Sequence, residues 1–114
     1  MTERKISVVI NTYNAERTLA KVLETVKGFD ECVVCDMEST DGTLAVASEY
    51  GCKIVTFPKA DHKSAEPART FAIQSASSPW VLVVDADELV TPQLREYLYK
   101  RIAEPDCPAG LYIP

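Results

Sequence analysis

The chain has 114 residues, of which 46% are hydrophobic and 25% charged, as in an ordinary globular protein with one domain. Its net charge of −5 argues against nucleic acid as a partner, because nucleic-acid-binding surfaces concentrate positive charge. No apolar run approaches the roughly 20 residues of a membrane-spanning helix, and the N-terminal residues lack the pattern of a signal peptide. We therefore expect a cytoplasmic protein without a transmembrane segment.

Hydrophobic runs that end in polar residues predict four strands, and helical patterns separate them. The predicted strands are Lys5–Ile10, Glu31–Cys35, Lys53–Phe57 and Trp80–Val84. The first helical stretch carries an apolar stripe at the spacing i, i+3, i+4 and i+7, formed by Leu19, Val22, Leu23 and Val26. Further helices are predicted at Thr43–Tyr50, from Pro67 to about Ser75, and from Thr91 to about Ile102. This alternation predicts a three-layer α/β/α fold with a mostly parallel sheet.

Polar residues follow three of the predicted strands at the point where each strand ends. Thr12, Tyr13 and Asn14 follow the first strand, Asp36 and Glu38 the second, and Asp85 and Asp87 the fourth. Ligands of such sheets bind beyond the carboxyl ends of the strands, where the strand order reverses. We therefore expect these three strand ends to converge on one site.

The sequence Asp85-Ala86-Asp87 places two carboxylates one residue apart, directly after a buried strand. Hard divalent cations prefer carboxylate ligands and carry phosphate oxygens with them, so a metal site is the favoured interpretation. The alternative is that both residues merely cap a turn before the next helix, since Asp is common in turns.

The four cysteines include a C-x-x-C pair, Cys32 and Cys35, inside a predicted strand. Strand positions three apart face opposite sides of a sheet, so the two sulfurs cannot easily serve one ion. Redox pairs of this kind also begin a helix, which is not the case here. With Cys52 and Cys107 isolated in the sequence, we expect free thiols packed in the core.

Four segments stand out as motifs: Ile6-Ser-Val-Val-Ile-Asn-Thr-Tyr-Asn14, Val34-Cys-Asp-Met-Glu-Ser-Thr-Asp-Gly-Thr43, Ala68-Arg-Thr-Phe-Ala-Ile73 and Trp80-Val-Leu-Val-Val-Asp-Ala-Asp-Glu88. In this order they resemble the V-S-V-V-I-P-T-Y-N, V-V-D-D-G-S-T-D-G-T, A-R-N-x-G-I and D-x-D motifs of family 2 glycosyltransferases. The resemblance covers roughly the first 90 residues. Singly each motif is weak, and together they are specific.

The resemblance implies a Rossmann-like GT-A fold, a nucleotide-diphosphate sugar, in particular a UDP-sugar, as donor, and Mg²⁺ or Mn²⁺ as cofactor. It also implies a glycan or lipid-linked acceptor, and the details look closest to bacterial enzymes of the lipopolysaccharide core or other envelope glycans. Such an enzyme is expected in the cytoplasm, at most peripheral to the inner membrane.

The resemblance implies that three residues of the motifs bind the nucleoside. By the resemblance, Thr12 and Tyr13 would line the nucleoside pocket, with the ring of Tyr13 against the base. Asp36 would accept a hydrogen bond from the base.

The resemblance also implies that three further residues bind the phosphates, the ribose or the metal. Arg69 would contact polar groups or phosphates of the nucleotide. Asp85 would lie near the ribose and the metal, and Asp87 would bind the metal directly. A bound cation would stabilise the charge that develops on the diphosphate leaving group.

The chain departs from the family motifs at several positions. Asn11 replaces the usual proline, Met37 the second Asp and Glu38 the glycine, while Phe71 and Ala72 replace the glycine-containing pair.

Length is the largest departure from the family. The acceptor site and the catalytic base of these enzymes lie in a C-terminal half that is absent here, so no catalytic residue is assigned. We expect residues 1–114 to be a single nucleotide-sugar-binding domain, the truncated N-terminal part of a longer glycosyltransferase, inactive alone. Faces exposed by the truncation would favour a homo-oligomer.

Two alternatives to a glycosyltransferase remain open from the sequence. One is a phosphatase of the haloacid dehalogenase type, in which Asp85 of the D-x-D motif would be the nucleophile. The other is a non-catalytic binding or assembly module.

Overall fold

The computed structural model describes residues 5–58 and 71–103. Its elements, in chain order, are β1 (Ile6–Thr12), α1 (Glu16–Thr25), β2 (Glu31–Asp36), α2 (Thr43–Glu49), β3 (Lys53–Thr56), β4 (Trp80–Asp85) and α4 (Pro92–Ile102). Residues 71–74 are also helical, at the end of the helix predicted from Pro67. All four predicted strands are confirmed, and each boundary differs from the prediction by two residues at most.

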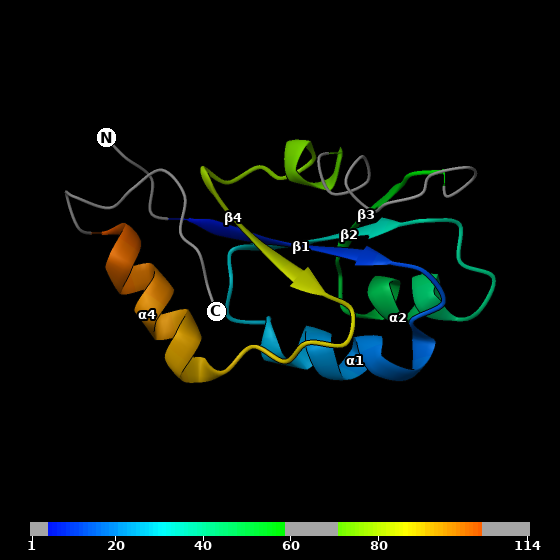
Figure 1. Ribbon diagram of the computed structural model, residues 1–114, viewed down its shortest axis with the longest axis horizontal. Helices are drawn as coiled ribbons and strands as arrows, with labels where there is room; N and C mark the ends of the chain where they lie inside the picture. Colours follow the sequence, from blue (N-terminus) through cyan, green and yellow to red (C-terminus); the bar gives the residue numbers. More distant parts are fainter. Residues whose placement is uncertain (1–4, 59–70, 104–114) are drawn as a thin grey trace.

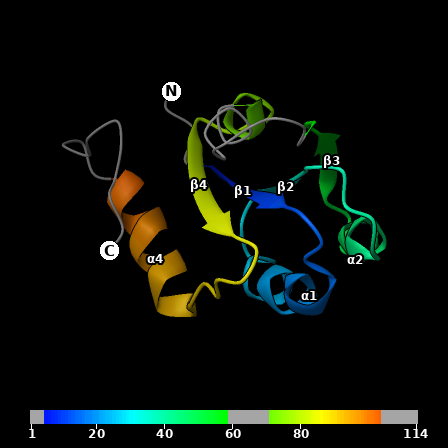
Figure 2. The same cartoon turned by 45° about the vertical axis from the view of Figure 1, so that its right-hand side comes forward.

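The four strands form one parallel sheet in the order β3-β2-β1-β4. From β1 the chain builds outward through β2 and β3, then crosses to the other side of β1 to form β4. The strand order therefore reverses between β1 and β4, the place where open α/β sheets leave a crevice for ligands. Both cartoon views place α1 and α2 on one face of the sheet and the helical segment 71–74 on the other (Figures 1 and 2). The predicted three-layer fold is confirmed.

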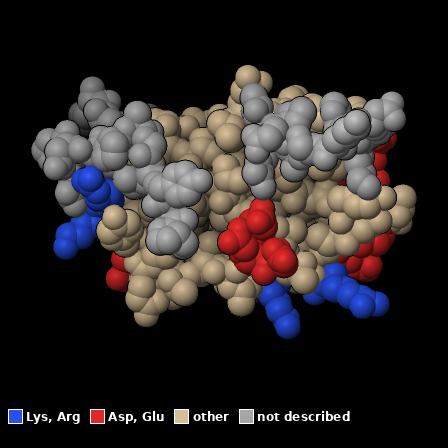
Figure 3. Space-filling view, viewed as in Figure 1, with Lys and Arg blue, Asp and Glu red and all other residues tan. Residues whose placement is uncertain are grey.

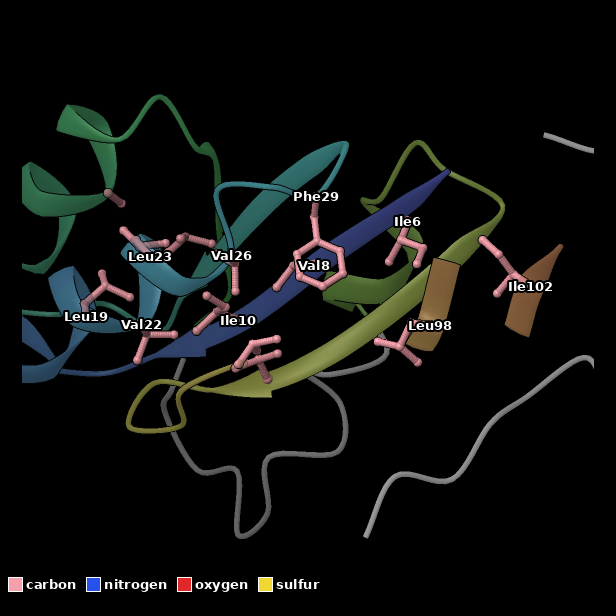
Figure 4. Close-up of a cluster of buried hydrophobic side chains, with 14 residues drawn as sticks. Ile6, Val8, Ile10, Leu19, Val22, Leu23, Val26, Phe29, Leu98 and Ile102 are labelled. Atoms are coloured by element: carbon pink, nitrogen blue, oxygen red, sulfur yellow. The ribbon is translucent and has the colours of Figure 1, made fainter. Parts of the chain in front are cut away.

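The main hydrophobic core lies between the sheet and the helices α1 and α4. Alternate residues of β1, namely Ile6, Val8 and Ile10, point toward these helices and are almost fully buried. From α1, from its C-cap residue and from α4, the core receives Leu19, Val22, Leu23, Val26, Leu98 and Ile102 (Figure 4). Each fully buried side chain of this size contributes roughly 1.5–3 kcal/mol by leaving water.

A smaller core covers the opposite face of the sheet. Val9, Val33, Cys35 and Ala72 form it, and all four have no exposed surface. Burial on both faces explains why β1 and β2 are continuous apolar runs and do not alternate with polar residues. The polar ends of these strands therefore stand out against an apolar background.

The described ranges contain no helix whose length and apolar character would let it cross a membrane.

Candidate functional site

The carboxyl ends of β1, β2 and β4 meet at one edge of the sheet. Thr12 of β1 is in register with Asp36 of β2, and Asn11 of β1 is in register with Asp85 of β4. Tyr13 follows β1 immediately, with 44% of its surface exposed. The structure thus brings Thr12, Tyr13, Asp36 and Asp85 to the edge at which the sequence predicted a site.

Asp36 is the most buried charged group of this edge, with 1% of its surface exposed. Its Oδ1 accepts hydrogen bonds from the hydroxyls of Thr12 at 2.7 Å and Ser39 at 2.6 Å. Its Oδ2 accepts one from the backbone N–H of Ser39 at 2.8 Å. These bonds offset the cost of burying a carboxylate and fix the loop after β2. A carboxylate has about four acceptor positions, so Oδ2 retains one for a further donor.

The loops after β1 and β2 are joined by reciprocal hydrogen bonds. The N–H of Asn14 donates to Ser39 Oγ at 2.8 Å, and the N–H of Thr40 donates to Asn14 Oδ1 at 2.7 Å. Asn14 has a positive φ of 50°, a conformation that Asn tolerates better than most residues. The backbone and side chain of Asn14 therefore join the two loops. Asn14 does not cap α1, whose N-cap is Ala15.

Glu38 also has a positive φ, of 65°, at the position where the family motif has glycine. Glycine adopts this left-handed conformation without the steric cost that a Cβ adds. The loop therefore keeps the backbone path that a glycine would favour even though the residue has changed. The N–H of the preceding Met37 donates to the carbonyl of Thr12 at 2.8 Å, which holds the start of the loop against β1.

Asp41 connects the starts of α1 and α2. Its carboxylate accepts from the backbone N–H of Thr43 at 2.9 Å, from the Thr43 hydroxyl, and from the N–H of Glu16 at 3.2 Å. The hydrogen bond from the Thr43 hydroxyl is the main cause that lowers the pKa of Asp41 below its ordinary value. Asp41 therefore has a structural function in positioning the two helices.

The chain turns sharply after β4 at Asp85-Ala86-Asp87-Glu88. Glu88 Oε1 accepts from the N–H of Asp85 at 2.9 Å, and the N–H of Glu88 donates to the carbonyl of Asp85 at 3.1 Å. The hydroxyl of Thr18 in α1 donates to the carbonyl of Ala86 at 2.7 Å and anchors the turn to the helix layer. The turn that carries the D-x-D motif is thus held in place by the carboxylate of Glu88, which follows the motif, and by helix α1.

Asp85, Asp87 and Glu88 are exposed and form an acidic patch at the end of β4, seen in red near the centre of Figure 3. Within residues 5–58 and 71–103, no group of three His, Cys, Asp or Glu side chains is arranged to hold an ion alone. The hard oxygen donors of Asp85 and Asp87 suit Mg²⁺, which proteins commonly bind through one or two carboxylates together with substrate phosphates. The donor set therefore fits a metal that arrives with a nucleotide.

Arg69, which was predicted to contact the nucleotide, lies outside the described residues.

The sequence analysis did not identify Ser39 as a residue of the site. Its position three residues after Asp36 is nevertheless typical of a side chain that folds back onto an Asp carboxylate. That spacing, read together with the positive φ at Glu38, accounts for the local loop path.

The cysteines were correctly predicted not to form one C-x-x-C site. Cys32 packs against the main core and Cys35 in the smaller core, on opposite faces of the sheet. Neither forms a disulfide, nor does Cys52, while Cys107 lies outside the described residues. The prediction of burial holds for Cys35, whereas Cys32 and Cys52 are only partly buried.

Cys32 and Cys52, 20 positions apart in the sequence, face each other across the start of β2 and β3. They line a cleft of about 420 Å³ at the opposite edge of the sheet from the D-x-D turn. The hydrogen bond with Cys32 lowers the pKa of Cys52, against the opposing effect of burial. The same hydrogen bond, together with burial, raises the pKa of Cys32.

We expect Cys52 to react with iodoacetamide before Cys32, because thiolate is the nucleophile and Cys52 loses its proton at lower pH. Peptide mass spectrometry over a pH series measures the modification of each residue. In Cys32→Ala, Cys52 loses its hydrogen-bond donor, so its alkylation should require higher pH. Faster labelling of Cys32 than of Cys52 would contradict the assignment.

The chain belongs to the family described as Glycosyl transferase family 2, whose sequence model matches residues 7–110. An uncharacterized glycosyltransferase of Rickettsia conorii is 36% identical over 99 residues, covering 83% of this chain and 34% of that protein. The lipopolysaccharide core biosynthesis glycosyltransferase LpsC of Rhizobium meliloti is 34% identical, covering 89% of this chain and 38% of that protein.

Solved structures of glycosyltransferases share the fold. The S. aureus TarS structure has a TM-score of 0.77 at 27% identity, covering 87% of this chain and 32% of that chain. The Mycobacterium tuberculosis glucosyl-3-phosphoglycerate synthase, in complex with Mn²⁺, UDP and glucosyl-3-phosphoglycerate, has a TM-score of 0.71 at 26% identity. It covers 87% of this chain and 39% of that chain. The present chain therefore spans about a third of the length of these relatives. Membership of this family argues against the phosphatase alternative.

Proposed function

We propose that residues 1–114 form the nucleotide-sugar-binding domain of a longer glycosyltransferase. The enzyme would transfer a sugar from a nucleotide-diphosphate donor, a UDP-sugar, to a glycan or lipid-linked acceptor, with Mg²⁺ or Mn²⁺ as cofactor. The observation that carries this proposal is the register of β1, β2 and β4, which aligns Thr12, Asp36 and Asp85 at one edge. This edge lies at the reversal of strand order, where α/β sheets bind ligands.

Thr12, Tyr13 and Asp36 form the nucleoside part of the proposed site. The exposed ring of Tyr13 at the end of β1 offers an apolar face on which a base can stack. The remaining acceptor position of Asp36 Oδ2 is suited to an N–H of the base. The role of Thr12 is to hold this carboxylate in place through its 2.7 Å hydrogen bond.

Asp85 and Asp87 form the metal part of the proposed site. Their carboxylates would share the ion with phosphate oxygens of the nucleotide, and Arg69 would add positive charge against those phosphates. The ion supplies Lewis-acid stabilisation of the diphosphate leaving group. The Mn²⁺ and UDP in the glucosyl-3-phosphoglycerate synthase complex support this assignment.

Residues 1–114 supply no assigned catalytic base, which we place in the remainder of the longer protein. Similarity to LpsC, named for lipopolysaccharide core biosynthesis, favours a bacterial envelope glycan as the product.

The proposal is tested by thermal unfolding of the chain with UDP, with Mn²⁺ and with both. We expect both ligands together to raise the melting temperature by more than the sum of the separate effects. At a ligand concentration about 100 times Kd, the stabilisation is about 2.7 kcal/mol, which corresponds to several degrees for a domain of this size. UDP with EDTA is the control. The absence of any shift with UDP and Mn²⁺ together would reject the proposal.

A further inference from the structure

Asn11 carries the one buried side-chain amide of the described ranges whose polar atoms are both without a hydrogen bond. Nδ2 and Oδ1 are each shielded from solvent and have no partner in residues 5–58 and 71–103. Because both atoms lack partners, this holds for either orientation of the amide. Buried polar groups are nearly always hydrogen-bonded, and leaving one unpaired is costly. The orphaned amide therefore needs an explanation.

The position of Asn11 points to the explanation. Its neighbours in register are Cys35 of β2 and Asp85 of β4, and paired residues of a parallel sheet project from the same face. Cys35, Asn11 and Asp85 thus form one row at the carboxyl edge, on the face opposite α1. The step from Asn11 to Asp85 crosses the reversal of strand order between β1 and β4. The orphaned amide therefore lies where the fold itself favours a ligand.

The two polar atoms of the amide restrict which chemical groups of a ligand could pair with it. A carboxamide presents a donor and an acceptor side by side. A diphosphate offers acceptors alone and would leave Oδ1 unpaired, whereas a ribose hydroxyl or the edge of a base offers both kinds of group. The proline of the family motif has no side-chain polar atom at all, so this contact belongs to the present chain.

We propose that the carboxamide of Asn11 is a specificity-determining contact of the nucleotide site, hydrogen-bonded to the nucleoside part of the donor. The inference rests on the proposed function and adds Asn11 to the residues of the proposed nucleotide site. Asn11 lies beside Asp85 in the sheet, at the same carboxyl edge as the Thr12–Asp36 pair, so a nucleoside bound beyond this edge would lie next to both.

The test compares wild type with Asn11→Leu, which keeps the size of the side chain and removes both polar atoms. Calorimetric titration in Mn²⁺ should show about tenfold weaker UDP binding, a change of 1.4 kcal/mol. Inorganic diphosphate, which lacks the nucleoside, should bind both proteins equally. Without ligand, the melting temperature of Asn11→Leu should equal or exceed that of wild type, because an unpaired polar group has been removed.

Val9→Ala is the matched control, since Val9 lies two residues earlier on the same face of β1 and is fully buried. It should lower the melting temperature and leave the UDP affinity of the folded protein unchanged. Asn11→Ala gives the same readout if the Leu variant does not fold.

Three results would overturn the inference. Equal UDP affinity in wild type and the Asn11 variants would remove Asn11 from the site while leaving the proposed function intact. Equal losses for UDP and diphosphate would show that the amide does not act through the nucleoside. Failure of wild type to bind UDP at all would reject the proposed function, and the inference with it.

Discussion

Asp87→Asn should abolish the Mn²⁺-dependent part of UDP binding. The substitution keeps the shape of the side chain and replaces an anionic oxygen ligand by a neutral amide, which a hard cation binds poorly. Loss of outer-shell support alone costs 10–100-fold in metal affinity, so loss of a direct ligand should weaken UDP binding in Mn²⁺ by roughly 100-fold or more. The measurement is calorimetric titration of UDP in Mn²⁺ and in EDTA.

Glu96→Gln is the matched control for Asp87→Asn. Glu96 is exposed on α4, is not one of the three residues of the acidic patch, and its substitution changes the net charge by the same amount. We expect the control to bind UDP as wild type does in Mn²⁺, and all three proteins to behave alike in EDTA. If Asp87→Asn and Glu96→Gln had the same UDP affinity in Mn²⁺, Asp87 would not be a metal ligand.

The second large effect is expected for Asp36→Ala, which should lower the free energy of unfolding by roughly 3 kcal/mol. The substitution removes the acceptor of three hydrogen bonds and leaves the hydroxyl of Thr12 buried without its partner. It also releases the loop after β2, so UDP binding should fall as well. Urea unfolding, with a check that the slope against denaturant is unchanged, measures the loss of stability.

Asp41→Ala is the informative comparison for Asp36→Ala. Asp41 also accepts three hydrogen bonds in the same loop, but its carboxylate is exposed to solvent. Water can replace its lost partners, so the stability loss should be clearly smaller. Equal losses for the two variants would show that the burial of Asp36 does not determine its contribution.

The order of strands and helices could be predicted because the signal is local. An apolar run closed by polar residues, such as Ile6–Ile10, predicts a buried strand and a chain reversal without any knowledge of its neighbours. The same prediction of burial for Trp80–Val84 was wrong, because β4 lies at the edge of the sheet and only Val84 of that run is buried. Parallel pairing then follows from the helices between the strands, and it brings Thr12, Asp36 and Asp85 to one edge.

The details of the site depend on contacts that the sequence does not specify. Asp36 was predicted as a ligand for the base, and the structure adds that most of its hydrogen-bonding capacity serves Thr12 and Ser39. A sequence pattern does not distinguish an acid that faces a ligand from one that organises a loop. The meeting of Cys32 and Cys52 likewise follows from the register of β2 against β3, which no local pattern fixes.

The unpaired amide of Asn11 is another feature of the site that the sequence alone does not reveal. The sequence marks it only as a departure from a motif. Its significance arises from burial without a partner, which depends on the packing around the end of β1.

The bonds that join Asn14 to Ser39 and Thr40 have a consequence for selectivity. They form entirely within the protein, so the two loops adopt their shape before any nucleotide arrives. In the proposed function, nucleotide binding would cost no conformational entropy for ordering these loops, and affinity would depend directly on how well a ligand fits them. This side of the proposed site would then act as a rigid template that does not adapt its shape to a poorly fitting nucleotide.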